Sequence, residues 1–200
     1  MSVLTRQQQH ITSDPGDLIS PKKRKRGEAT GDLAKLLLRL SIGGLLTGHG
    51  AQKLFGWFGG PGLKGTAALM GMLGLEEQPW GTLAGLSEFG GGALTSLGLL
   101  HPLGPIATLG AMGVAAGKVH KGKPIWATEG GAELSVLYMA AAVALSLDDP
   151  GRLSLDRLFG IRVPKAISLL AMAGVVASVV FVIQKEPAQA APSDQQKPQA

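Results

Sequence analysis

Four ionisable side chains fall on one face of the first apolar segment of the chain, within an arc of about 80° at 100° per residue. They are Lys35, Arg39, His49 and Lys53. A cation at the centre of a bilayer costs at least about 2.5–3.5 kcal/mol, so this face must turn toward other helices, water or lipid head groups. The other faces of the segment are apolar enough to contact lipid. The segment therefore needs partner helices.

Two acids lie in later apolar segments. Glu88 is in the middle of one, about eight residues or roughly 12 Å from its start, and Glu133 is in the first turn of another. A lysine can hold an oxyanion, and a histidine beside a carboxylate can move protons. We predict a polar pocket in the outer half of a helix bundle, with a core of His49, Lys53, Glu88 and Glu133. Secondary candidates are Arg39, Gln52, Lys118 and His120.

Two other interpretations of these side chains stay open. The four core residues can lock the helices together by ion pairing without any ligand, and Glu133 can simply favour the N-terminus of its helix. A metal site is less well supported. His49, His120 and the two glutamates offer suitable ligand atoms, but no pair has the HxxxH or ExxH spacing that bundle metal sites show. We therefore predict no metal ligands.

The elements that position these residues are membrane helices. Hydrophobic residues make up 45% of the 200 residues and charged residues only 16%, and the polar residues are crowded into the two ends. We predict an all-α integral membrane protein with a four-helix transmembrane bundle, a fifth C-terminal transmembrane helix and a short interfacial helix after the first span. The spans are expected near 33–54, 79–100, 102–119, 131–147 and 163–182, and the interfacial helix near 63–74.

The bundle is expected to occupy residues 32–160, and its first helix could be capped by Thr30 or Asp32. Residues 1–31 are predicted to be a disordered basic cytoplasmic tail without a cleavable signal, residues 161–184 an extra transmembrane helix, and residues 185–200 a disordered tail.

The net charge of +5 comes largely from the basic run at 22–26. We interpret this run as a juxtamembrane anchor against anionic lipid. The same run resembles a nuclear import signal or a nucleic-acid patch, but its place before a membrane span makes that interpretation unnecessary, and no nucleic-acid partner is expected.

The charges also predict the orientation. A cytoplasmic N-terminus places 12 of the 19 Lys and Arg residues inside, as the positive-inside rule favours. Trp57, Trp80 and Trp126 then all fall at the outer interface, as an aromatic belt would. We therefore expect a multi-pass protein of the cell (inner) membrane with its N-terminus in the cytoplasm.

Two glycine patterns have simple explanations. Residues 60–65 formally match GxGxxG, but a dinucleotide site needs a preceding strand, and here a membrane helix precedes the glycines. Gly113 and Gly117 match GxxxG, for which we expect close helix packing. The chain has no cysteine, so in any thiol or sulfur redox chemistry a partner or cofactor must carry the electrons.

Three segments carry long sequence motifs: HGAQKLFGWFGGPGLKGT at 49–66, ATEGGAELSVLYMAAAVALSL at 127–147 and DPGRLSLDRLFG at 149–160. Together they resemble the DoxX family of small bacterial integral membrane proteins, over about 33–160. The resemblance implies a four-helix membrane bundle with His49, Lys53, Glu88 and Glu133 at the family's polar positions. The family is similar to the DoxD-type subunit of thiosulfate:quinone oxidoreductase, and its members are associated with membrane redox complexes and with oxidative or thiol stress. The basic tail and the fifth span depart from the family pattern.

Two functions follow as expectations. The first is a subunit of a membrane oxidoreductase system, whose pocket binds a quinone head group, with quinone as the candidate cofactor, or a small sulfur-containing substrate. The alternative is a non-enzymatic scaffold that recruits soluble redox or oxidative-stress enzymes. Either function could involve a homo- or hetero-oligomer in the lipid bilayer. A small transporter is less well supported, because the inverted repeats and broken-helix pairs typical of one are missing.

Overall fold

The computed structural model describes residues 21–186, with side chains from residue 28 onward, and this part of the chain is helical without strands. Its main helices are α1 (Pro21–Phe55), α2 (Gly62–Met72), α3 (Glu77–Leu97), α4 (Leu103–Val114), α5 (Glu133–Leu147), α6 (Leu155–Phe159) and α7 (Lys165–Gln184). Three short turns complete it: η2 (Trp57–Gly59), η3 (Ala115–Val119), which continues α4, and η4 (Ala127–Glu129). The all-helical fold class is confirmed.

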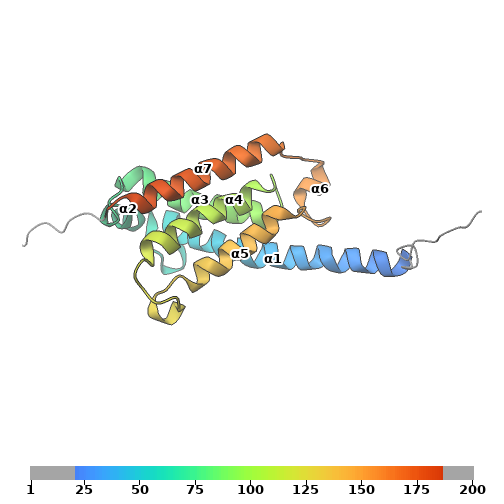
Figure 1. Cartoon of the computed structure of the whole chain (residues 1–200), viewed down its shortest axis with the longest axis horizontal. Coiled ribbons are helices and arrows are strands. Elements are labelled where there is room, and N and C mark those ends of the chain that lie inside the picture. The colour runs from blue at the N-terminus through green and yellow to red at the C-terminus, as the bar shows by residue number, and fades with distance from the viewer. Residues whose placement is uncertain (1–20, 187–200) are drawn as a thin grey trace, which may run out of the picture.

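The apolar segments lie where the sequence predicts helices, with one large difference. α1 begins at Pro21 instead of near residue 33, so it includes the basic run at 22–26 and projects well beyond the other helices (Figure 1). Asp32, a candidate cap, lies inside α1, and its Oδ1 accepts a hydrogen bond from the backbone N of Arg152 at 2.9 Å. Of the tails expected at 1–31 and 185–200, residues 1–20 and 187–200 lie outside the described residues, whereas residues 21–31 belong to α1.

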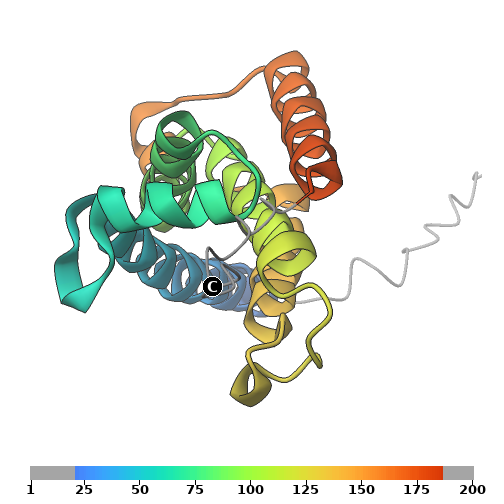
Figure 2. The same cartoon turned by 90° about the vertical axis from the view of Figure 1, so that its left-hand side faces the viewer.

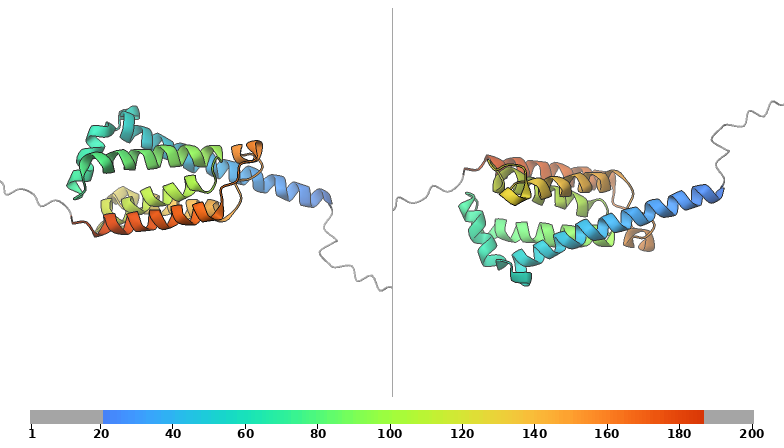
Figure 3. Two further views of the ribbon diagram at one scale, coloured as in Figure 1. Left: turned by 90° about the horizontal axis from the view of Figure 1, so that it is seen from above. Right: turned by 90° about the horizontal axis from the view of Figure 1, so that it is seen from below.

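Helices α1, α3, α4 and α5 run side by side, as seen along their axes in Figure 2. Helix α1 packs against α3, α3 against α4, and α4 against α5, while α2 crosses one end of the bundle against α3 and α1. Helix α7 packs on the outer side of α4, and the two views in Figure 3 place it on the opposite side of the molecule from α1.

Glycines allow the α1–α3 contact to be close. A Cβ atom added at Gly50 would lie 2.2 Å from the backbone N of Phe89, and one added at Gly43 would lie 2.5 Å from the carbonyl oxygen of Gly92. Such distances exclude a side chain at either glycine. The α1 backbone therefore runs directly against the α3 backbone.

Helix α7 docks on α4 through a second glycine face. The glycines are Gly110, Gly113 and Gly117, and they face Val175, Val179 and Ile183 respectively. A Cβ atom at Gly113 would lie 3.2 Å from Val179 Cγ1, and one at Gly117 only 2.4 Å from Ile183 Cδ1. The GxxxG pattern therefore serves close helix packing, as predicted.

Among the described residues, α7 alone is long and apolar enough to cross a membrane by length and composition. Its most apolar 18-residue window has a mean hydropathy of 2.6, and only 6% of that window is buried. Leu103–Val119 and Glu133–Leu147 are apolar but shorter, while α1 and α3 carry charges and many glycines. The five predicted spans are thus five apolar or partly apolar helices, of which one passes this test.

Candidate functional site

Lys53 and Glu88 form an ion pair between the last turn of α1 and the middle of α3. The Glu88 side chain is only 3% exposed and the Lys53 side chain 29%. Gly85, one turn before Glu88, makes room for this approach, because a Cβ atom there would lie 2.4 Å from Leu54 Cδ2. The absence of a side chain at Gly85 therefore lets the acid approach the lysine.

The second oxygen of Glu88 has no hydrogen-bond partner among the described residues. Lys53 Nζ donates to Oε1, whereas Oε2 is buried and makes no hydrogen bond to any described residue. Leaving a buried acceptor unsatisfied costs about 1–3 kcal/mol, more for a charged group, and such groups in native proteins usually have a functional or solvent explanation. Glu88 thus presents a free acceptor atom inside the protein.

Lys53 and Glu88 both line an apolar cavity of about 450 Å³ between α3, α4 and α7, with α2 at one end. Its three walls include Leu83 of α3, Ala111 of α4 and Val179 of α7. The indole of Trp80, which lines the cavity, stacks on the ring of Phe181 of α7, with ring centroids 5.8 Å apart and planes inclined by 19°. The cavity suits a ligand with an apolar body and one polar group.

His49 does not line this cavity. Its side chain is exposed, and its Nδ1 lies 3.1 Å from Oε1 of Gln52, which is half-buried and does not line the cavity either. The stripe of α1 that faces α3 passes through Gly43, Gly50 and Lys53. His49 precedes Gly50 by one residue, so its side chain lies about 100° around the helix from Gly50 and on the far side of Lys53 from the two glycines.

Glu133 also lies away from the cavity. Its Oε2 accepts a hydrogen bond from the backbone N of Ala127 at 2.9 Å, and its own N donates to Ile125 O at 2.9 Å. The acid therefore fixes the loop that leads into α5. Of the four predicted core residues, the structure brings together Lys53 and Glu88.

Lys118 and His120 organise the same end of the molecule. The Lys118 ammonium donates to the carbonyl oxygen of Lys185 just after α7, and His120 Nδ1 lies 2.6 Å from Gly130 O. Neither residue lines the cavity. Within the described part of the chain, no three His, Cys, Asp or Glu side chains are placed to hold a metal ion.

Arg39 lies at the opposite end of the bundle. Its side chain is buried, with 1% of the residue exposed, and it donates to the carbonyl oxygen of Leu153. The guanidinium occupies the space beside Gly98, where any Cβ atom would clash with Nη1. Gly98 ends α3 with φ 60°, a left-handed conformation that glycine adopts readily.

Asp156 is a buried acid beside Arg39 that the analysis of the sequence did not single out. Its two carboxylate oxygens accept hydrogen bonds from the backbone N of Leu100 at 2.8 Å and of His101 at 2.7 Å. It lies in the first turn of the short helix α6, which Ser154 caps by accepting from Arg157 N at 3.3 Å. The motif DPGRLSLDRLFG could have pointed to Asp156, because it places Ser154 and Asp156 in one turn-like segment.

Two titratable groups in the loops at this end have shifted pKa values. A hydrogen bond from Lys35, 2.9 Å from Oδ2, lowers the pKa of Asp148. Burial lowers the pKa of His101 and outweighs the opposing effect of its hydrogen bond to the Asp148 carbonyl oxygen at 2.9 Å. This end of the molecule is therefore held by charged and polar contacts, in contrast to the apolar cavity.

Comparison with known proteins gives one match. No curated protein and no solved structure matches the chain, whereas the family model of DoxX matches residues 34–121. The matched part contains Lys53 and Glu88 and ends before Glu133, so it is shorter than the resemblance over about 33–160 implied. The match runs from within α1 to just past η3, and together with the helical fold it supports membership of the DoxX family.

Proposed function

We propose that this DoxX protein crosses the cell (inner) membrane several times, with α1, α3, α4–η3, α5 and α7 as spans and the N-terminus in the cytoplasm. Large apolar side chains on the outside of the helices support this arrangement. Leu45 of α1, Leu86 of α3 and Leu137 of α5 are 61%, 53% and 58% exposed, and Leu170 of α7 is 73% exposed. Exposed apolar surface of this extent is typical of contact with lipid or with other subunits.

Within that membrane bundle, we propose that the cavity beside Lys53 and Glu88 binds the head group of a lipid-soluble quinone or quinol. The carrying observation is that Glu88, whose buried Oε2 makes no hydrogen bond to a described residue, lines a cavity with mostly apolar walls. A ligand hydroxyl would satisfy this acceptor, and Lys53 could donate to a ligand carbonyl oxygen. The apolar walls from α3, α4 and α7 would contact the ring and tail.

Such a ligand would supply two-electron, two-proton redox chemistry. Glu88 would hold the hydroxyl proton at Oε2, and Lys53 would keep the carboxylate oriented and neutralised. Because the chain has no cysteine, a thiol or sulfur compound that donates electrons must be a substrate or belong to a partner. The chain would act as a membrane subunit of an oxidoreductase system.

A direct test is titration of the purified full-length protein in detergent with a short-chain benzoquinone and its quinol, followed by tryptophan fluorescence, because Trp80 lines the cavity. We expect saturable binding of the quinol that weakens roughly tenfold in Glu88→Gln, since an acceptor becomes a donor. Glu133→Gln makes the same chemical change away from the cavity and should bind as the wild type does. Absence of saturable binding by either form of the ligand would refute the proposed function.

A second candidate, the non-enzymatic scaffold for soluble redox enzymes, is favoured by the loop before α5. Residues 121–129 are exposed throughout, and they include Ile125 at 48% and Trp126 at 59% exposure. This loop stands away from the bundle in Figure 2. If the loop recruits a soluble enzyme, Trp126→Ser should abolish its co-purification with the membrane protein and leave quinol binding unchanged. Identical co-purification by the wild type and the variant would contradict recruitment through this loop.

A further inference from the structure

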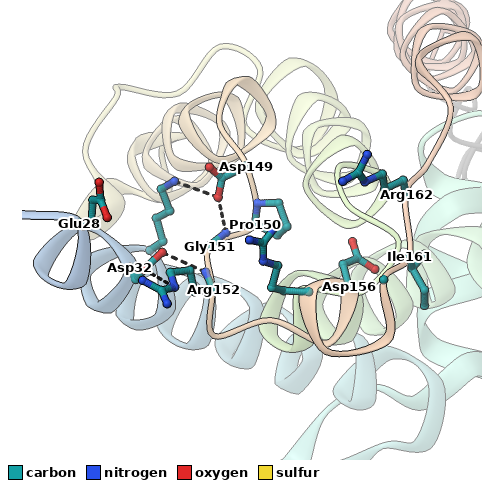
Figure 4. A pocket seen from close by; sticks show the side chains of 13 residues that line it. Glu28, Asp32, Asp149, Pro150, Gly151, Arg152, Asp156, Ile161 and Arg162 are labelled. Carbon is teal, nitrogen blue, oxygen red and sulfur yellow. Dashed lines mark hydrogen bonds and ion pairs between the residues drawn. The ribbon is translucent and has the colours of Figure 1, made fainter. Parts of the chain in front are cut away.

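A second cavity, of about 650 Å³, lies at the end of the bundle where α6 meets α1 (Figure 4). Three arginines line it: Arg152, Arg157 and Arg162. Four acids and Lys35 also line it, so its wall carries charges of both signs. The contacts of each group decide which of these charges are free to bind a ligand.

Three of the acids are already engaged by the protein. Both oxygens of Asp156 accept backbone hydrogen bonds. Asp149 Oδ1 accepts from Gly151 N at 2.6 Å and pairs with Lys35 Nζ at 3.2 Å. Asp32 Oδ1 accepts from Arg152 N at 2.9 Å. The fourth acid, Glu28, lies on the opposite side of the cavity from Arg162 (Figure 4).

The arginines are not engaged in this way. The side chains of Arg157 and Arg162 are exposed and form no hydrogen bond or ion pair with the described residues. Arg152 Nε reaches Asp32 Oδ2 only at 3.9 Å, and its side chain is 71% exposed. Three guanidinium groups therefore border one cavity with a single long ion pair among them.

Guanidinium groups match the planar, bidentate geometry of phosphate oxygens, and several around one cavity favour a phosphate ester. Arg162 also lies three residues before Lys165, where α7 begins. Because α7 is apolar enough to cross a membrane, its start belongs at the level of the lipid phosphates. We propose that this cavity is a phosphate-ester site and that the head group of an anionic phospholipid supplies the phosphate.

The test uses the full-length protein in detergent and measures the shift in its unfolding temperature on adding short-chain phosphatidylglycerol. Short-chain phosphatidylcholine and free glycerol phosphate form two further arms. The variant Arg157→Gln/Arg162→Gln removes two of the three guanidinium groups without touching Asp156. Lys121→Gln/Lys123→Gln removes the same charge from exposed positions at the other end of the bundle and serves as the control.

We expect phosphatidylglycerol to stabilise the wild type and the control equally, with an affinity that falls at least about tenfold in the arginine variant. Preference for phosphatidylglycerol over glycerol phosphate supports a lipid source, whereas equal binding supports the phosphate site with a soluble source. No stabilisation by any of the three compounds, or an equal loss in the two variants, would overturn the proposal. The two cavities share no lining residue, so the outcome of this test does not bear on the proposed quinol site beside Lys53 and Glu88.

Discussion

Replacing Lys53 with Met removes the ammonium group and keeps most of the length of the side chain. Glu88, 3% exposed, would then have a partner for neither carboxylate oxygen. Breaking a buried ion pair in this way costs about 3–5 kcal/mol, and we expect about 3 kcal/mol because Lys53 is 29% exposed. For a chain of this size, that loss lowers the unfolding temperature by about 6–12 °C.

The reverse change, Glu88→Gln, should cost only about 1 kcal/mol, because the flexible lysine can turn its charge toward water. The double variant should then be more stable than the sum of the single losses by about 2 kcal/mol. Lys64→Met, the same change at an exposed lysine of α2, should shift stability by less than about 0.5 kcal/mol. Thermal unfolding in detergent measures the stability of these four variants against that of the wild type. Additive losses in the double variant would refute the ion pair between α1 and α3.

Three further predictions concern other parts of the molecule. Gly113→Val should displace α7 from α4, because a side chain at this position meets Val179. Limited proteolysis should then cleave the variant before α7 more readily than the wild type. Unchanged cleavage would contradict the docking. Burial lowers the pKa of His101, so the folded state resists protonation of this side chain. The free energy of unfolding should therefore fall as the pH drops below about 6.5. A pH series of unfolding temperatures should show a smaller decline for His101→Gln. His49→Ala should leave quinol affinity unchanged in the fluorescence titration, since His49 lies outside the cavity; a loss as large as that of Glu88→Gln would restore the four-residue pocket.

The fold was predictable because each apolar run in the sequence becomes one helix. The glycines around Glu88 form a closely packed face that allows α1 to approach. The early start of α1 was not predictable from capping signals, because Asp32 uses its carboxylate to hold Arg152 of a distant loop. Local sequence rules cannot show that a side chain is engaged by a segment more than a hundred residues away.

The candidate site was predictable in part. Helical periodicity placed Lys53 on the polar arc, and the structure pairs it with Glu88. The same arc included His49, but an arc of about 80° is too broad to decide which of its edges faces the next helix. Glu133 is satisfied by its own loop, and Asp156 is buried by a fold-back of α6 that no periodicity encodes. The role of α7 as a cavity wall depends on its tertiary packing, chiefly against α4, and not on a local sequence pattern.

The most direct test of the central claim is to locate a bound quinone. A photoreactive short-chain quinone would be crosslinked to the full-length protein in detergent, and the labelled peptides identified by mass spectrometry. The account predicts labels on α3 and α7 residues that line the cavity, such as Leu83 and Val179, and their loss when unlabelled quinol competes. Labels spread over the exposed faces of α1 and α5, unchanged by competition, would contradict it.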